Sequence, residues 1–315
     1  MYRIGIDLGG TNIAVGIVNE NYEIVREGSI PTKAERNVDE IVADMSAFCK
    51  RLVSEAGMTL SDISAIGMAI PGTVNSATGI VEYANNIHFF NYPMVERFGK
   101  LFGNGNIYIG NDANMAAVGE MVAGSGKGAK DLVLITLGTG VGGGVVIGGK
   151  LLTGFKFGGA ELGHTVIEYN GRPCTCGRKG CFEAYSSATA LINMTREKIE
   201  TGVETLMNDF VKRDGKISGR TAFAAMKQGD KAASEVVDTY ISYLAVGVAN
   251  MINIFQPEVF CIGGGISGEG DYLIKPLKEK IADQIYNHKN GVHTRIATAS
   301  LGNKAGIIGA AAICE

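Results

Sequence analysis

A short segment in the middle of the chain, residues 161–183, holds two glutamates near its ends together with a histidine and three cysteines. The histidine and cysteines follow the order His-x9-Cys-x-Cys-x4-Cys, at positions His164, Cys174, Cys176 and Cys181. One imidazole and three thiolates make a closed tetrahedral zinc set, which has no open position for a reacting water. Small apolar core residues or a disulfide fit less well, because Pro, Thr, Gly, Arg and Lys flank the first two cysteines. We therefore predict a structural zinc site, which leaves Glu161 and Glu183 free to hold a polar ligand.

The carboxylate of Asp112 is a second candidate for chemistry. The short apolar run at 107–109 predicts a strand and residues 115–122 predict a helix, so Asp112 lies at the junction, directly after Asn111. A carboxylate at such a junction is either a general base or the N-cap of the helix. Taken alone, the pattern favours the cap.

Two amides, those of Asn85 and Asn86, precede the aromatic pair Phe89 and Phe90. Amide side chains can bind hydroxyl groups, but asparagine is also common in turns, where it hydrogen-bonds to the backbone. The local sequence leaves both interpretations open.

Glycine is unusually frequent, with 45 residues, and its clusters lie between apolar runs. The first cluster follows the apolar run 2–6 and reads Asp7, Leu8, Gly9, Gly10, Thr11 before a second apolar run. This order predicts a strand, a tight turn and a return strand. Such a turn offers backbone N–H groups and the Thr11 hydroxyl to phosphate oxygens, with Asp7 near any bound cation. For this turn alone, a plain hairpin is the preferred interpretation.

The second cluster begins Gly138, Thr139, Gly140 and formally matches G-x-G-x-x-G. A dinucleotide fingerprint must open a helix, whereas residues 145–147 predict another strand. A P-loop is excluded as well, because no Gly-Lys pair in the chain precedes Ser or Thr. The cluster instead repeats the first one 129 residues later, with position 136 over position 7. This repeat predicts an internal duplication with two phosphate-binding hairpins.

A third cluster, Gly263 to Ser267, follows the buried strand pattern at 259–262. Here a flat ring could lie against the bare backbone of Gly264 and Gly265.

Length and charge limit the remaining classes of protein. A chain of 315 residues suits two lobes, and a net charge of −3 gives no global attraction for nucleic acid or anionic membranes. No apolar run of about 18 residues exists, and the N-terminus opens directly into a strand pattern. We expect a cytoplasmic protein that binds a small polar ligand, with no nucleic-acid or membrane partner.

Apolar periodicity predicts the remaining elements. Helices are expected at 37–56, 187–199, 221–228, 230–255, 272–286 and 304–313. Further strands are expected at 63–70 and 295–299, and residues 73–106 predict only turns and short strands. The Ala-rich and Gly-rich last helix favours close packing against the first lobe.

Six motifs together resemble the ROK family of sugar kinases and sugar-responsive repressors, and within it the bacterial glucokinases. They occur in family order across essentially the whole chain: DLGGT at 7–11, GNDAN at 110–114, GTGVGGG at 138–144, ELGH at 161–164, CTCGRKGCFE at 174–183 and GGGIS at 263–267. The resemblance implies an α/β fold of the actin-like ATPase (ribonuclease H-like) type. Its two lobes would each have a mixed β-sheet and helices, with ATP and sugar in the cleft. The expected lobes are 1–111 plus 302–315, and 112–301 with the zinc segment 164–181.

The resemblance also implies roles for the site residues, with Asp112 as the catalytic base. The residues expected to hold the sugar are Asn86, Asn111, Asp112, Glu161, His164 and Glu183. Those expected to bind ATP and its Mg²⁺ are Asp7, Gly9, Gly10, Thr11, Gly138, Thr139, Gly140, Gly264 and Gly265. His164 would serve Zn²⁺ through one ring nitrogen and the sugar through the other, which a neutral imidazole allows.

The expected activity is transfer of the ATP γ-phosphate to the 6-hydroxyl of a hexose, with glucose as the first choice. N-acetylmannosamine, N-acetylglucosamine, allose and fructose are alternative substrates, and polyphosphate is an alternative donor. A sugar-sensing regulator is disfavoured, because family repressors carry an additional N-terminal DNA-binding domain and this chain starts at its first strand. A binding protein without turnover is disfavoured by the presence of Asp112 and both hairpins. A homodimer is expected, although the sequence does not separate it from a tetramer.

Overall fold

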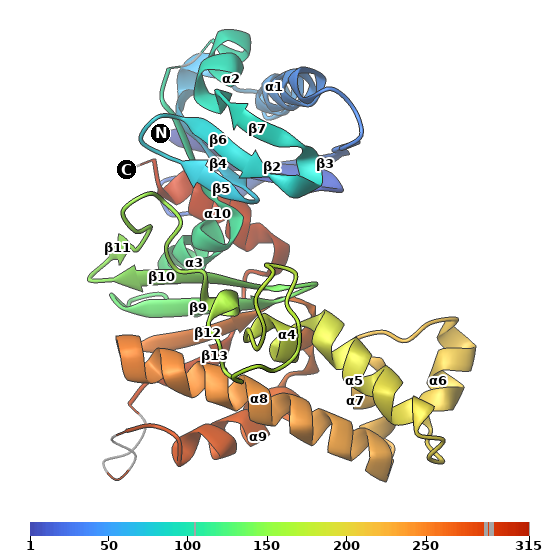
Figure 1. Cartoon of the computed structure of the whole chain (residues 1–315). Helices are drawn as coiled ribbons and strands as arrows, with labels where there is room; N and C mark the ends of the chain where they lie inside the picture. The colour runs from blue at the N-terminus through green and yellow to red at the C-terminus, as the bar shows by residue number, and fades with distance from the viewer. Residues whose placement is uncertain (104, 287–288, 290–292, 315) are drawn as a thin grey trace. The chain divides into compact units, whose positions relative to one another are not determined.

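The computed structural model describes residues 1–103, 105–286, 289 and 293–314, and the chain packs into two compact units (Figure 1). The first unit comprises Met1–Leu132, Gly144–Ala160 and Ser300–Glu315, and the second comprises Val133–Gly143 and Glu161–Ala299. Both units contain strands and helices. The lobe boundaries expected from the sequence remain a prediction.

The first unit is built on a five-stranded mixed sheet. In spatial order its strands are β3 (Ile24–Pro31), β2 (Asn12–Val18), β1 (Tyr2–Leu8), β4 (Ile63–Ile70) and β8 (Ile107–Asn111). β1 and β2 form the predicted antiparallel hairpin, whereas β4 and β8 continue the sheet in parallel. The carboxyl ends of β1 and β8 therefore lie at the same edge of the sheet, and these ends carry Asp7 and Asn111.

Opposite faces of this sheet pack against different helices. Ile4, Ile6 and Leu8 of β1 share a core with α1 (Val38–Glu55), whose N-cap is Asn37 as predicted. The alternate residues of β1 face the other side. A Cβ atom at Gly5 would lie 1.9 Å from the carbonyl oxygen of Ile307, in α10 (Ala305–Ala312). The approach of α10 therefore requires glycine, and the predicted packing of the last helix against the first lobe is confirmed.

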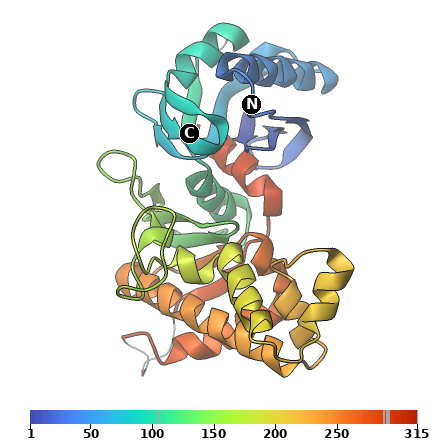
Figure 2. The same ribbon diagram turned by 45° about the vertical axis from the view of Figure 1, so that its right-hand side comes forward.

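The helix α10 also packs closely against α3 (Asp112–Ala123), and both views show the two side by side (Figure 2). A Cβ atom at Gly309 would lie 1.7 Å from the carbonyl oxygen of Met115, and one at Gly119 would lie 2.2 Å from that of Ala305. At the end of α3 the buried carboxylate of Glu120 accepts hydrogen bonds from the backbone N–H groups of Ser300 (3.1 Å) and Leu301 (2.8 Å). These contacts fix the position of α3.

Residues 73–106 contain more structure than the sequence predicted. A three-stranded antiparallel sheet is formed by β5 (Thr73–Asn75), β6 (Ile80–Ala84) and β7 (Phe89–Tyr92), followed by α2 (Met94–Phe102). The expectation of turns and short strands only was wrong for α2. Its buried Met94, Phe98 and Phe102 are spaced four residues apart, and the two rings stack with centroids 5.6 Å apart. A helix this short offers too few turns for its period to stand out.

A second five-stranded sheet repeats the topology of the first. Its order is β11 (Lys150–Leu151), β10 (Val141–Ile147), β9 (Leu132–Leu137), β12 (Val259–Gly263) and β13 (Arg295–Thr298). Here β9 takes the place of β1, and β12 and β13 are parallel like β4 and β8. The shared topology is the one that the predicted duplication requires.

Helices make up most of the second unit. They are α4 (Glu183–Ser186), α5 (Ala188–Glu200), α6 (Met207–Asp214), α7 (Thr221–Met226), α8 (Lys231–Phe255) and α9 (Asp271–Ala282). α8 buries thirteen residues and contacts α5, α7 and α9. The sequence prediction missed α6. It also extended α9 to residue 286, whereas that helix ends at Ala282.

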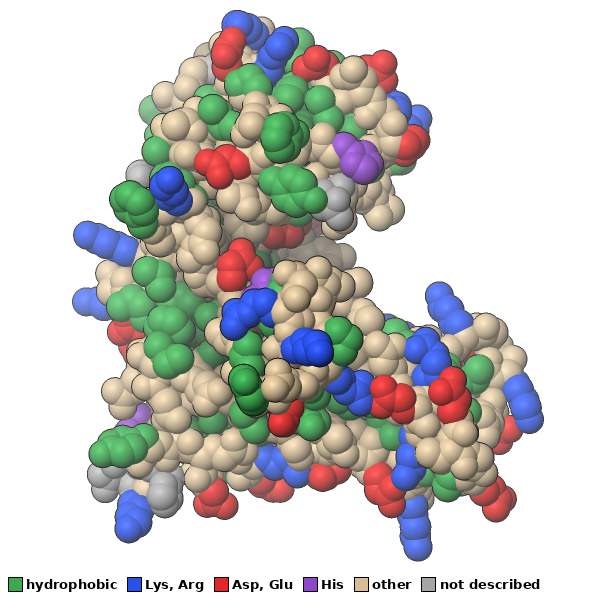
Figure 3. Space-filling view, in the orientation of Figure 1, with side chains coloured by type: hydrophobic (Ala, Val, Ile, Leu, Met, Phe, Trp, Pro, Cys, Tyr) green, Lys and Arg blue, Asp and Glu red, His purple; other side chains and the backbone are tan. Residues whose placement is uncertain are grey.

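Acidic and basic side chains are interspersed on the face shown in Figure 3, as the small net charge suggests. Among the described residues, no helix combines the length and apolarity that a membrane crossing needs.

Candidate active site and metal centre

The first glycine turn lines a pocket in the first unit. Asp7, Gly9, Gly10 and Thr11 border a cavity of about 620 Å³. The turn is held in place by Thr32, whose hydroxyl donates to the carbonyl of Gly9 (2.6 Å) and whose N–H donates to that of Thr11 (2.8 Å). Sequence reasoning missed the far wall of this cavity, where Lys304 pairs with Glu27 at 3.0 Å.

Asp112 is the first residue of α3, but it does not cap the helix. The N-cap is Asn111, whose side-chain oxygen accepts the N–H groups of Ala113 (3.0 Å) and Asn114 (3.2 Å). The side-chain amide of Asn111 donates to the carbonyl of Gly72 at 3.0 Å. The local preference for Asp112 as the cap was therefore wrong. Asn111 supplies the cap, and one oxygen of the Asp112 carboxylate also accepts the N–H of Ala113 at 2.9 Å.

The carboxylates of Asp7 and Asp112 influence each other. Burial raises the pKa of Asp7 to about 6, and the negative charge of Asp112 contributes to that rise. Burial also raises the pKa of Asp112, although hydrogen bonds from the backbone of Ala113 and from Asn111 oppose the increase. Two carboxylates that lie near each other are costly to ionise together, because like charges repel.

Asn86, expected to bind sugar, is exposed and lies close to the first glycine turn. A Cβ atom at Gly10 would be 3.6 Å from the Cβ atom of Asn86. The side chain of Asn85 falls outside the described part of the structure. The first unit thus gathers one set of predicted residues: Asp7, Gly10, Asn86, Asn111 and Asp112.

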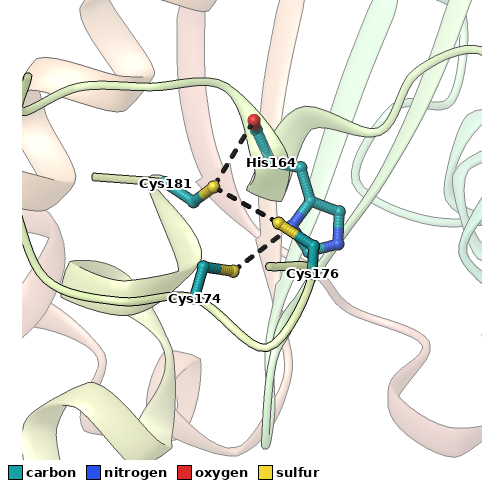
Figure 4. Close-up of side chains that lie close together, drawn as sticks. All are labelled: His164, Cys174, Cys176 and Cys181. Carbon is teal, nitrogen blue, oxygen red and sulfur yellow. Dashed lines mark hydrogen bonds between the residues drawn. The ribbon is translucent and has the colours of Figure 1, made fainter. Parts of the chain in front are cut away.

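The predicted zinc ligands converge in the second unit. One ligand atom from each of His164, Cys174, Cys176 and Cys181 lies within 4.8 Å of all the others (Figure 4). Cys174 Sγ is 3.6 Å from His164 Nδ1, and Cys176 Sγ is 3.6 Å from Cys181 Sγ. A tetrahedral ion with Zn–S bonds of about 2.3 Å sets two sulfurs about 3.8 Å apart. The four side chains therefore fit one tetrahedral ion.

Two glycines let the chain turn around this cluster. Gly177 has φ +87° and Gly180 has φ +80°, a region that other residues rarely adopt. Gly180 also has no room for a side chain, since a Cβ atom would lie 1.7 Å from the carbonyl oxygen of Glu168. A hydrogen bond of 2.9 Å from Cys174 N–H to the carbonyl of Arg178 closes the turn between the cysteines.

The two glutamates that flank the cluster differ. Glu161 is exposed, and its carboxylate has no hydrogen-bond partner among the described residues. Glu183 is partly engaged, because one oxygen accepts the N–H of Val141 (2.9 Å) and the other accepts the Thr175 hydroxyl (3.2 Å). The sequence-based view that Glu183 is as free as Glu161 needs that correction. Glu183 connects the metal cluster to the strand that follows the second glycine turn.

The second and third glycine turns lie against each other. Gly264 has φ +84°, and a Cβ atom there would lie 2.5 Å from both the nitrogen and the oxygen of Leu137. The start of α5 also holds the second turn in place. The N–H of Ala188 donates to the carbonyl oxygen of Gly138 (2.8 Å), and the Thr189 hydroxyl donates to the carbonyl oxygen of Thr139 (2.7 Å).

A second cavity, of about 690 Å³, opens beside Gly265. It is lined on its other side by polar and basic residues from the region of α6 and α7: Arg213, Lys216, Ser218, Arg220 and Thr221. Sequence reasoning missed this wall. The only available signal was a cluster of charged and small polar residues at 213–221.

The raised pKa of Asp7 predicts a pH-dependent stability. Because the pKa of Asp7 in the folded state, about 6, exceeds the ordinary aspartate pKa of 3.8, the folded state binds more protons between these values. Stability must then fall as the pH rises through that window. In urea denaturation of the ligand-free protein, Asp7→Asn should remove about 1.4 kcal/mol of the loss between about pH 5 and about pH 7.5.

Asp62→Asn provides the control. Hydrogen bonds from Thr59 lower the pKa of Asp62, so its carboxylate stays ionised in both states across this range. Its stability difference from the wild type should not change with pH. A flat difference for Asp7→Asn as well would contradict the assignment.

Comparison with known proteins agrees with this arrangement. The profile of the ROK family matches residues 3–315. The glucokinase of Thermotoga maritima is 38% identical over 99% of this chain and 96% of its own, and that of Halalkalibacterium halodurans is 37% identical over 98% and 93%. The structure of a ROK family glucokinase from Streptomyces griseus, in complex with glucose and AMPPNP, is 32% identical, covers 99% of both chains and has a TM-score of 0.82. The actin-like ATPase fold expected from the sequence is confirmed, and the chain belongs to the ROK family.

Proposed function

We propose that this protein is an ATP-dependent glucokinase, which transfers the γ-phosphate of ATP to the 6-hydroxyl of glucose. One observation carries the proposal: Asp112 is not the N-cap of its helix, and its carboxylate lies close enough to Asp7 to raise the pKa of that residue. The similarity to two glucokinases over nearly the whole chain supports the same activity.

Asp112 acts as the general base. It accepts the proton of the 6-hydroxyl while that oxygen attacks the γ-phosphorus, and the bond from phosphorus to the β,γ-bridging oxygen breaks to release ADP. Burial supports this role, because a carboxylate with a raised pKa is a stronger base than an ordinary one. Its place at the start of α3 also keeps the ionised form available, since a helix N-terminus favours negative charge.

Sugar hydroxyls are bound by Asn86, Asn111, Asp112, Glu161, His164 and Glu183. Hydrogen-bonding capacity supports these roles. Asn111 keeps one amide N–H beyond its bond to Gly72, and Glu183 keeps acceptor sites beyond its bonds to Val141 and Thr175. His164 directs Nδ1 at Cys174, so its Nε2 points away from the cluster (Figure 4).

The phosphates of ATP are bound by the two glycine hairpins, through N–H groups at Gly9, Gly10 and Thr11 and at Gly138, Thr139 and Gly140. The pocket of about 620 Å³ at the first hairpin supports this role. The nucleoside occupies the cavity of about 690 Å³ beside Gly264 and Gly265, where exposed backbone suits a flat ring.

A magnesium ion fits the first unit, because the carboxylates of Asp7 and Asp112 have no basic partner among the described residues and are suitable ligands for a hard cation. Asp7 would hold it through water. When bound, Mg²⁺ neutralises charge on the phosphate oxygens.

Zinc is the metal that the cluster of His164, Cys174, Cys176 and Cys181 would hold. Three thiolates and one imidazole at tetrahedral spacing are characteristic of structural zinc. The ion would fix the ring of His164 and the loop beside Glu183, whose carboxylate lies 3.6 Å from Cys174 Sγ. Its contribution is therefore to position sugar-binding groups.

The cytoplasmic location and the homodimer expected from the sequence remain predictions. The alternatives within the family are a kinase for another hexose and a sugar-responsive regulator. A panel of hexoses assayed with ATP and Mg²⁺ separates these, because a regulator would bind sugar without turning it over.

Metal analysis tests the zinc assignment. The purified protein should contain one zinc per chain, and Cys176→Ser should lose most of it together with thermal stability, because a closed site depends on all four ligands. Cys314→Ser, outside the cluster, is the matched control and should keep its zinc. Full zinc content and an unchanged Tm in Cys176→Ser would show that the four side chains do not form a metal site.

Asp112→Asn tests the kinase assignment. Asn keeps the size of Asp but cannot take up a proton, so kcat should fall by about two to four orders of magnitude while glucose binding weakens far less. Glu183→Gln is the comparison, and it should mainly raise the KM for glucose. Steady-state assays and titration calorimetry on both variants supply the data. A near-normal kcat in Asp112→Asn would mean that another group is the base.

A further inference from the structure

Two ligand atoms of the metal cluster lie close enough to react with each other. Cys176 Sγ and Cys181 Sγ are 3.6 Å apart, joined by a dashed line in Figure 4. A disulfide needs a separation of about 2.05 Å, so the two sulfurs must approach by about 1.5 Å. Side-chain rotation and the glycine turn between them, with Gly177 and Gly180, can supply that movement.

The two sulfurs also differ in access to solvent. Cys176 is exposed, whereas Cys181 is buried beneath it. An oxidant therefore reaches Cys176 first, and the buried thiol is the nearest group able to resolve the oxidised sulfur. The cysteines of the two main cores, Cys49 and Cys261, are fully buried and offer no competing route.

The third cysteine of the cluster, Cys174, contacts other side chains besides those of Cys176 and Cys181. Cys174 Sγ lies 3.6 Å from His164 Nδ1 and 3.6 Å from the Glu183 carboxylate. It is separated from Cys176 by one residue, which makes a disulfide between them a small strained ring. Cys176 and Cys181 are the pair that combines a sulfur–sulfur contact of 3.6 Å with an exposed first thiol.

We propose that Cys176 and Cys181 form a peroxide-sensitive thiol pair, whose oxidation to a disulfide releases the metal and weakens sugar binding. This inference rests on the zinc and sugar-binding roles proposed above. It adds a modification site and names its reactant class, a hydroperoxide.

The chemistry balances with hydrogen peroxide as the oxidant. The Cys176 thiolate attacks one peroxide oxygen, the O–O bond breaks, and the departing hydroxide takes a proton to become water. The Cys181 thiolate then attacks the sulfenic sulfur, the S–S bond forms, and the S–O bond breaks to release a second water after protonation. Two thiolates, one peroxide and two protons give one disulfide and two waters. The zinc ion leaves as Zn²⁺ without changing its oxidation state.

Metal loss follows because only His164 and Cys174 remain as ligands, too few for a closed site. The ring of His164 then loses the contact that fixes it, and the loop beside Glu183 loosens. Both groups are proposed to hold sugar, so the KM for glucose should rise more than kcat falls. Dithiothreitol with added zinc should reverse the change.

The test uses the zinc-loaded full chain and limiting hydrogen peroxide. A chromophoric chelator follows zinc release, and mass spectrometry of unreduced peptides maps the disulfide. Zinc should be released in proportion to the Cys176–Cys181 disulfide, with Cys174 still open to alkylation and Cys49 and Cys261 reduced. Retained zinc, a disulfide through Cys174, or sulfinic acid at Cys176 without a disulfide would each overturn the inference.

Cys176→His is the matched variant, because two cysteines and two histidines also form a closed zinc set. It should keep its zinc in peroxide, and release at the wild-type rate would contradict the assigned pair. If the variant fails to bind zinc, the wild-type disulfide map still decides. Zinc missing from the untreated wild type would instead refute the metal proposal, so the two failures are distinguishable.

Discussion

The neighbouring carboxylates of Asp7 and Asp112 impose the constraint on which the first unit depends. Ionising both without a cation is unfavourable, and burial raises the pKa of each. The fold nevertheless holds them in place through α10, whose Gly306 approaches Asp7 so closely that a Cβ atom would lie 2.5 Å from its Oδ2. A site with two such carboxylates is suited to a cation, such as the Mg²⁺ ion that accompanies a nucleotide.

In the second unit, polar groups must be held rigidly in a segment that has little regular secondary structure. Residues 165–182 form turns and two isolated β-bridges, and apolar packing there is sparse. The proposed zinc ion, held by four side chains, would supply the cross-links that a hydrophobic core otherwise gives. Glu183 extends this cross-linking to the second glycine turn through its bond to Val141. The proposed redox sensitivity has the same origin, because the cysteine ligands that would make this segment rigid can also be oxidised.

Sequence patterns predicted much of this structure where local chemistry determines it. Three of these features depend on residues close together in the sequence: the hairpin at 7–11, the second hairpin 129 residues later, and the capped helix after Asn37. The structure contains all three. The metal cluster was also predictable, since its ligand spacing lies within one segment. Features that depend on tertiary contacts were not predictable from the sequence. The cap at Asn111 rather than Asp112, the tie from Glu183 to Val141 and the short helix α2 each involve partners or packing that local spacing does not reveal.

Transfer of the γ-phosphate of ATP to the 6-hydroxyl of glucose can be read from the reaction product itself. The most direct measurement is ¹H–³¹P NMR of the product formed from glucose, ATP and Mg²⁺, with 6-deoxyglucose as a parallel substrate. We expect a phosphorus signal coupled to the two protons on carbon 6, and no sugar phosphate from 6-deoxyglucose. Phosphate on another carbon, or equal phosphorylation of 6-deoxyglucose, would contradict it.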